Sequence, residues 1–279
     1  MWRVLAVWCG LAACSFRPGG AAGDAPGSSD VAAQDARSTD AAPGDAAGPD
    51  ASSPDAASPD AAAAVTPPSR TMEAHAHTLG ASPMALSYAL AIPAGAQRYL
   101  LVSVQIGANC GDNPTAATTS VTYAGIALTR IAQVTGTPAC DVAATRSEQW
   151  GLVAPPSSGT VAITLAGPVK TIHSGALAFA GVDPANPVRG SVALAGAGTT
   201  SSLAIASALD ELVVNTVGQG TGISAPGAAQ TAAFIQNATT HNTLDNSAAS
   251  TAPGAAVVTM TWTFGGIDEW QSISTSLRP

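Results

Sequence analysis

The chain has 279 residues, of which 46% are apolar, 10% charged and 4% aromatic, and its formal net charge is −8. The length is enough for two average domains. A single lysine, Lys170, accompanies nine arginines, whereas a nucleic-acid-binding protein needs clustered cations along its binding surface. The composition therefore excludes a nucleic-acid partner, although the averages conceal segments of very different character.

The N-terminus is typical of an export signal. It reads MWRVLAVWCGLAAC, with Arg3 ahead of an apolar run from Val4 to Ala13. A membrane-spanning helix needs about 20 apolar residues, so this shorter run predicts the core of a signal peptide.

The end of that run, Leu11-Ala12-Ala13-Cys14, resembles the lipobox of bacterial lipoproteins. In that family the cysteine thiol is diacylated and the preceding peptide is removed. The resemblance implies a lipoprotein signal over 1–14, palmitate-type lipidation at Cys14 and a membrane anchor at the N-terminus. Ser15, where Asp retains such proteins at the inner membrane, implies the outer membrane, with the domain either surface-exposed or periplasm-facing. The alternative is ordinary cleavage near Ala22 and release of a soluble protein.

Residues 15–69 are almost entirely Ala, Asp, Pro, Ser and Gly. Aspartate recurs at every fifth position from Asp30 to Asp60, a spacing that matches neither a helix nor a strand. We expect a disordered tether, because these residues cannot bury a core. A flexible chain of 69 − 14 = 55 residues would span about 40–45 Å root-mean-square.

From residue 70 to 279 the pattern changes to short runs rich in Val, Thr, Ala and Ile, separated by turn residues. Several runs alternate, and 99–106 and 258–264 each place apolar residues on one face. This predicts an all-β, antiparallel β-sandwich, jelly-roll-like, with two sheets. The 176–180 segment is apolar on both faces and is expected in a central strand. The predicted strands are 85–92, 99–107, 119–124, 127–135, 145–154, 159–166, 171–182, 188–195, 201–207, 211–218, 230–237, 255–264 and 269–277.

The sequence of this region also resembles a β-sandwich domain that recurs in secreted and surface proteins of bacteria. The resemblance rests on SVTYAGIALTRI (120–131), EQWGLVAPPSSGTVAITLAG (148–167), SGALAFAGVDPANP (174–187) and DELVVNTV (210–217). It implies fold and location, and it transfers no site residue. The Asp/Ala/Pro-rich tether after a lipobox similarly resembles outer-membrane lipoproteins of GC-rich Gram-negative bacteria.

Two cysteines, Cys110 and Cys140, remain once Cys9 leaves with the signal and Cys14 is acylated. In an exported chain the natural state of such a pair is a disulfide. Free thiols or a metal-bound pair are the alternatives, and the absence of a CxxC spacing gives zinc no support.

Familiar catalytic signatures are missing from the sequence, so no cofactor and no enzymatic activity are expected. Glu73, His75 and His77 alternate along one predicted strand, where two imidazoles and a carboxylate would be able to approach one metal. A solvated strand face is the alternative for these three. His173 shares a face with apolar residues and is expected as a semi-buried, hydrogen-bonded histidine.

Trp270 is out of phase with its apolar neighbours and shares its face with Ser272, Ser274 and Ser276. An exposed tryptophan on a sandwich is able to stack on a sugar, which makes Trp270 a candidate ligand contact. The alternative is that a bulge after Gly266 returns the ring to the core.

These observations favour a lipid-anchored, non-catalytic cell-surface protein that presents its sandwich for binding or adhesion to a glycan or a protein partner. A structural or envelope-assembly lipoprotein that contacts other proteins is the second hypothesis. A hydrolase that works from the sandwich loops, with His173 or His241, is the third.

Overall fold

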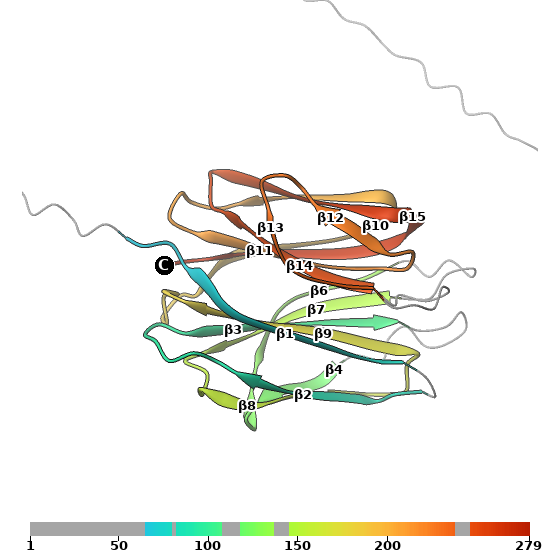
Figure 1. Ribbon diagram of the computed structural model, residues 1–279, viewed down its shortest axis with the longest axis horizontal. Coiled ribbons are helices and arrows are strands. Elements are labelled where there is room, and N and C mark those ends of the chain that lie inside the picture. The colour runs from blue at the N-terminus through green and yellow to red at the C-terminus, as the bar shows by residue number, and fades with distance from the viewer. Residues whose placement is uncertain (1–64, 80–81, 108–117, 137–144, 238–245) are drawn as a thin grey trace, which may run out of the picture. The chain divides into compact units, whose positions relative to one another are not determined.

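The computed structural model describes residues 65–79, 82–107, 118–136, 145–237 and 246–279. All of them belong to one compact unit, 61–279. This part of the chain is built from antiparallel strands in three sheets, stacked one upon another (Figure 1). No helix long and apolar enough to cross a membrane occurs within these residues.

The sheets take their names from their positions in Figure 1, and the strands of each follow in spatial order. The middle sheet consists of β1 (Ser69–Leu79), β9 (Thr171–Ala180), β3 (Tyr99–Gly107), β7 (Thr145–Val153) and β6 (Thr129–Thr135). The lower sheet consists of β2 (Ala85–Ala91), β8 (Ser158–Leu165), β4 (Thr118–Tyr123) and β5 (Ile126–Ala127). The upper sheet consists of β10 (Val188–Ala206), β15 (Val257–Leu277), β11 (Leu212–Gln219), β14 (Asn246–Pro253) and β13 (Thr231–Asn237), with β12 (Ile223–Pro226) paired to β15.

The interior strands of the middle sheet are buried on both faces because the sheet lies between the other two. On β3, Leu100, Val102 and Val104 pack in the core shared with the lower sheet. Tyr99 and Leu101, which point the opposite way, pack in a second core with residues of the upper sheet. The sequence predicts one buried and one solvated face for this strand, and this was wrong because a third sheet covers the second face.

The upper sheet is covered on its outer side by its own strands. Residues 188–198 of β10 pair with 268–277 of β15, and 200–206 pair with 257–263. The register shifts between Gly198 and Thr200, and Gly198 has a φ of 139°, a conformation that favours glycine. The second part of β10 (200–206) and the first part of β15 (257–264) therefore fold back over β11 and β14, and we call these two segments the flap.

The flap is held by two apolar clusters. Leu203, Trp262 and Phe264 pack with Val217 and other residues of the upper sheet. A neighbouring cluster joins Ile205, Val258 and Met260 of the flap to Val213 and Ala252 of the upper sheet. The flap and the upper sheet therefore pack together as two layers.

The all-β antiparallel sandwich is confirmed, and β9 is an interior strand as the 176–180 segment predicts. The structure differs from the expectation in having three sheets in place of two. It also joins two pairs of predicted strands, 188–195 with 201–207 and 255–264 with 269–277, into the continuous β10 and β15.

Candidate functional site

Three predicted metal-ligand candidates lie on β1, at one edge of the interface between the middle and upper sheets. Glu73, His75 and His77 share a face, as their alternation predicts, opposite Leu177, Gly175 and His173 of β9. Glu73 forms an ion pair with Arg70. The His75 ring stacks on Phe234 at 5.1 Å between ring centroids, and His77 stacks on His173 at 5.2 Å. Each of the three therefore has a protein partner, and no group of three His, Cys, Asp or Glu side chains suited to a metal occurs among the described residues.

The His173 side chain is fully buried. Its Nδ1 lies 3.4 Å from Oε1 of Gln236, while no hydrogen-bond partner is described for Nε2. Burial lowers the pKa of His173 to about 4, with a further decrease from His77 and a partial increase from the Gln236 contact. The imidazole is therefore neutral at pH 7, as a histidine within a sheet interface needs to be.

His173 belongs to a polar row that crosses the middle sheet. A second row lies in the upper sheet, and Gln236 connects the two because it contacts both His77 and His173. Where the rows face each other, the Gln105 side chain comes within 3.0 Å of the position that a Cβ on Gly218 would occupy. We call the two rows together the polar seam. In strand order they are His77, His173, Gln105 and Ser147 in the middle sheet and Gln236, Ser247, Gly218 and Gln271 in the upper sheet.

Several buried polar atoms of the seam have no hydrogen-bond partner among the described residues. They are Nε2 and Oε1 of both Gln105 and Gln271, Oγ of Ser147 and Nε2 of His173. An unsatisfied buried polar group costs about 1–3 kcal/mol. The seam thus offers donors and acceptors to water or to another small polar molecule.

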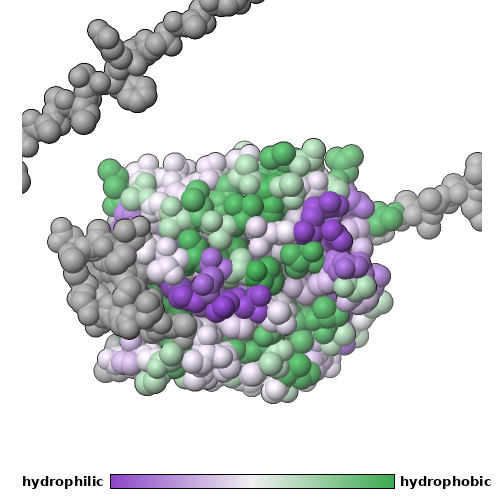
Figure 2. Space-filling model, turned by 180° about the vertical axis from the view of Figure 1, so that it is seen from behind, coloured by the Kyte–Doolittle hydropathy of each residue, from purple (hydrophilic) through white to green (hydrophobic). Residues whose placement is uncertain are grey.

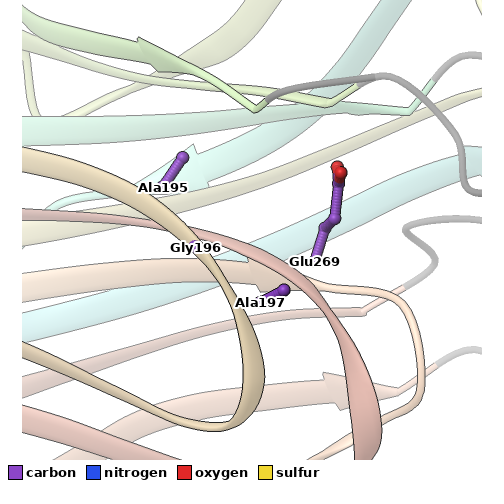
Figure 3. A pocket seen from close by; sticks show the side chains of 4 residues that line it. All are labelled: Ala195, Gly196, Ala197 and Glu269. Atoms are coloured by element: carbon purple, nitrogen blue, oxygen red, sulfur yellow. The ribbon is translucent and has the colours of Figure 1, made fainter. Parts of the chain in front are cut away.

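A small pocket of about 180 Å³ adjoins the seam at Gln271, the last of its residues in the upper sheet. It is lined by Ala195, Gly196, Ala197 and Glu269, and Figure 3 shows the Ala195 and Glu269 side chains extending in the same direction from neighbouring strands. Ala195 is the register partner of Gln271, which places the pocket beside the last seam residue. Its size suits one or a few small polar molecules.

A larger groove of about 560 Å³ lies where β6 and β7 approach the start of β10. Its lining is predominantly apolar, and among the described residues that line it Arg130 alone is charged. The lining residues are Tyr99, Ala127, Thr129, Arg130, Ile131, Gly151, Leu152, Val153, Pro187 and Val188. A concave, mostly apolar hollow with few polar groups is the usual form of a ligand-binding site.

Two polar side chains of the groove differ in their surroundings, since Tyr99 is buried and Arg130 is exposed. The Tyr99 ring lies over Gly151, where any side chain would collide with its hydroxyl group. Burial raises the pKa of Tyr99, so the phenol stays neutral. Cζ of Arg130 lies 5.6 Å from the centroid of the Trp150 ring, a cation–π arrangement. Trp150 is fixed in turn by a 2.9 Å hydrogen bond that its Nε1 donates to Glu148.

Trp270 is not a surface residue. Its side chain is only 7% exposed and packs with Trp262 and Phe264 of the flap. The ring also lies against Gly196, where a Cβ would approach it to 2.6 Å. The interpretation of Trp270 as a ligand contact is therefore corrected, because the flap covers the face on which the ring lies, and the alternative of a return to the core holds.

The lipidation and disulfide predictions concern Cys14, Cys110 and Cys140, which lie outside the described residues, as does His241. The strand ends nearest the two later cysteines are neighbours, because Gly107 of β3 pairs with Thr145 of β7. The disulfide and the lipid anchor stay predictions.

Sequence reasoning did not identify the groove. Tyr99, Arg130 and Val188 come from three strands that are far apart in the chain, and they meet only because the upper sheet packs on the middle one. No spacing or motif within one strand indicates that meeting.

Comparison of the chain with protein-family models, with curated proteins and with solved structures finds no match.

Proposed function

We propose that the protein is a lipid-anchored, non-catalytic cell-surface protein whose β-sandwich binds a ligand in the groove beside Tyr99 and Arg130. The observation that carries the binding role is the groove itself, which sets a 560 Å³ apolar hollow beside the exposed Arg130. The surface location rests on the lipobox resemblance at Cys14 and on the tether composition.

The lining specifies the class of ligand. Apolar side chains such as Ile131, Leu152 and Val188 favour an apolar body, while the guanidinium of Arg130 favours an anionic group such as a carboxylate. A sugar would require more hydrogen-bonding groups than Thr129, Tyr99 and Arg130 supply, and the buried Trp270 offers it no stacking surface. The ligand is therefore an apolar molecule or segment with an anionic group.

Two fluorescent probes test this proposal. Anilinonaphthalene sulfonate is apolar and anionic, whereas Nile red is apolar and uncharged. Both are expected to bind the full-length protein with one site. Arg130→Gln should weaken binding of the sulfonate about threefold to tenfold, the loss of one charge-assisted contact, and should leave Nile red unchanged. Val188→Asp should weaken both probes.

Lys170→Gln is the matched control, because it removes one positive charge outside the groove lining. Equal weakening of the sulfonate by Lys170→Gln and by Arg130→Gln would show that only net charge matters. Binding of either probe that is unaffected by Val188→Asp would place the site elsewhere and overturn the proposal.

The structural or envelope-assembly role is a second candidate function. It is favoured by a different observation, a long unprotected strand edge in the upper sheet.

A further inference from the structure

Strand β10 forms one edge of the upper sheet and pairs only with β15. Its stretch from Gly190 to Gly198 keeps regular register with β15, and the shifts lie on either side of it. On the free side, no backbone hydrogen bond from another strand of the described chain reaches this stretch. Such an edge presents a row of unpaired N–H and C=O groups that is able to pair with another strand.

The other edge strands of the described chain carry features that oppose such pairing. These features are charged side chains, register irregularities, short length or flanking prolines. In β1 they are Arg70, Glu73 and a register shift, in β6 Arg130 and a register shift, and in β13 a register shift at 232–234. The strand β5 has only two residues, β12 has four and ends in Pro226, and Pro83 and Pro93 flank β2. Natural proteins use these devices to prevent edge-to-edge association, and the stretch of β10 from Gly190 to Gly198 lacks them.

The exposed side chains of β10 add an apolar contact. Val192 is 38% exposed and Leu194 is 46% exposed. They lie two residues apart and therefore on the same face of the strand. Figure 2 shows apolar surface gathered above a hydrophilic band on the side of the molecule that is hidden in Figure 1.

We propose that β10 pairs antiparallel with β10 of a second copy of this chain. The spacing is self-complementary: a two-fold axis at Ala193 sets Val192 of each copy opposite Leu194 of the other, and Gly190 opposite Gly196. The two Arg189 side chains would then be about 27 Å apart, at ~3.4 Å per residue, well beyond the ~8 Å screening length. No like charges meet, and the two upper sheets become one continuous sheet.

The tether of the same chain does not suit this edge. Its aspartates recur at every fifth residue and its prolines at 43, 49, 54 and 59 remove backbone donors. The 190–198 stretch of a second β10 is uncharged and has the same length, so the copy is the better occupant.

Light scattering after size-exclusion chromatography, combined with hydrogen exchange, tests the pairing on the full-length protein. The dimer fraction should rise between about 1 and 300 µM, the range of weak dimers. Amides 190–198 should gain protection over the same range. Leu194→Lys should hold the protein monomeric, because it places a charge opposite an apolar partner without removing a buried side chain. Val192→Lys should do the same, and its melting temperature serves as the folding check.

Ile235→Lys is the matched control, since Ile235 is 37% exposed on β13 at the opposite edge of the same sheet. This variant should dimerise as the parent does. A protein that stays monomeric at all concentrations, or a dimer that Ile235→Lys disrupts and Leu194→Lys does not, overturns the proposal. Protection of 190–198 only on addition of cell extract would indicate a different protein as the partner and would also overturn it.

Discussion

At the scale of single residues, Glu211 is the most heavily bonded carboxylate of the described chain. It is 2% exposed and accepts hydrogen bonds from Arg189, Ser207 and Ser276, with the Arg189 contact at 2.6 Å. Desolvation raises its pKa, but the hydrogen bonds from Ser276, Arg189 and Ser207 and the charge of Arg189 together lower it below the usual 4.5. Glu211 thus joins the start of β10 to the end of β15.

Glu211→Gln should lower the free energy of unfolding by about 2–4 kcal/mol at pH 7, because it leaves Arg189 without its charged partner. Since the folded pKa lies below the unfolded one, the contribution of the carboxylate is complete above the unfolded value and is lost as pH falls through the folded value. Urea unfolding at pH 7 and pH 3 should therefore show a smaller acid-induced loss in the variant than in the parent.

Asp210→Asn is the control, because it changes the neighbouring carboxyl group and should alter stability by less than about 0.5 kcal/mol. An equal effect of both substitutions would show that the Glu211 contacts contribute little.

Trp270 shows what the sequence can and cannot predict at this scale. Its position out of phase with Ile273 and Leu277 was correctly identified as unusual. Whether the ring is exposed depends on the flap, which is formed by residues that precede it by several positions and by the distant 200–206. Periodicity within one strand contains no information about a covering layer.

At the scale of elements, a hydrogen bond between Trp262 and Asn215 links the flap to β11 of the upper sheet. Trp262 donates through Nε1 to Oδ1 of Asn215 at 2.7 Å, and Nδ2 of Asn215 donates to Ser272 and Ser274 at 2.9 and 2.8 Å. The serine face of β15, whose composition suggests a solvated surface, is therefore an internal polar network.

Asn215→Ala should destabilise the protein by about 2–4 kcal/mol, because it leaves the buried Trp262 Nε1 and two serine hydroxyls without this partner. Urea unfolding followed by tryptophan fluorescence measures the effect. Thr259→Ala, on the exposed side of the flap, is the control and should change stability by less than about 0.5 kcal/mol. Equal stability of the two variants would mean that the flap is held by apolar packing alone.

Strand positions were largely predictable, and β3 coincides with the predicted 99–107. Two strands of the upper sheet escaped prediction, the short β12 and β14. Strand β14, with the sequence NSAASTAP, has no large apolar residue. It is nevertheless buried on both sides, because small side chains allow the flap and the middle sheet to approach it closely. Composition alone indicates a loop for such a segment.

At the scale of the whole molecule, the predicted organisation is an anchor, a tether and one sandwich. Cys14→Ser should abolish labelling by palmitate and move the protein from the membrane pellet to the soluble fraction, since each buried methylene of an acyl chain contributes about 0.8 kcal/mol. Cys9→Ser, which changes the other N-terminal cysteine, should leave both unchanged. A Cys14→Ser protein that still sediments with membranes would contradict the anchor.

The middle sheet has a consequence for how this chain tolerates sequence change. In most β-sandwich strands every second position faces solvent and tolerates substitution, but every residue of β3 is buried. Substitution at Gln105 or Ser103 therefore disturbs an interior just as substitution at Val104 does. A substitution scan of this strand should therefore find every position intolerant, without the alternation between tolerant and intolerant positions of an ordinary strand. Neutral substitutions are expected in the outer layers and in the segments that connect them.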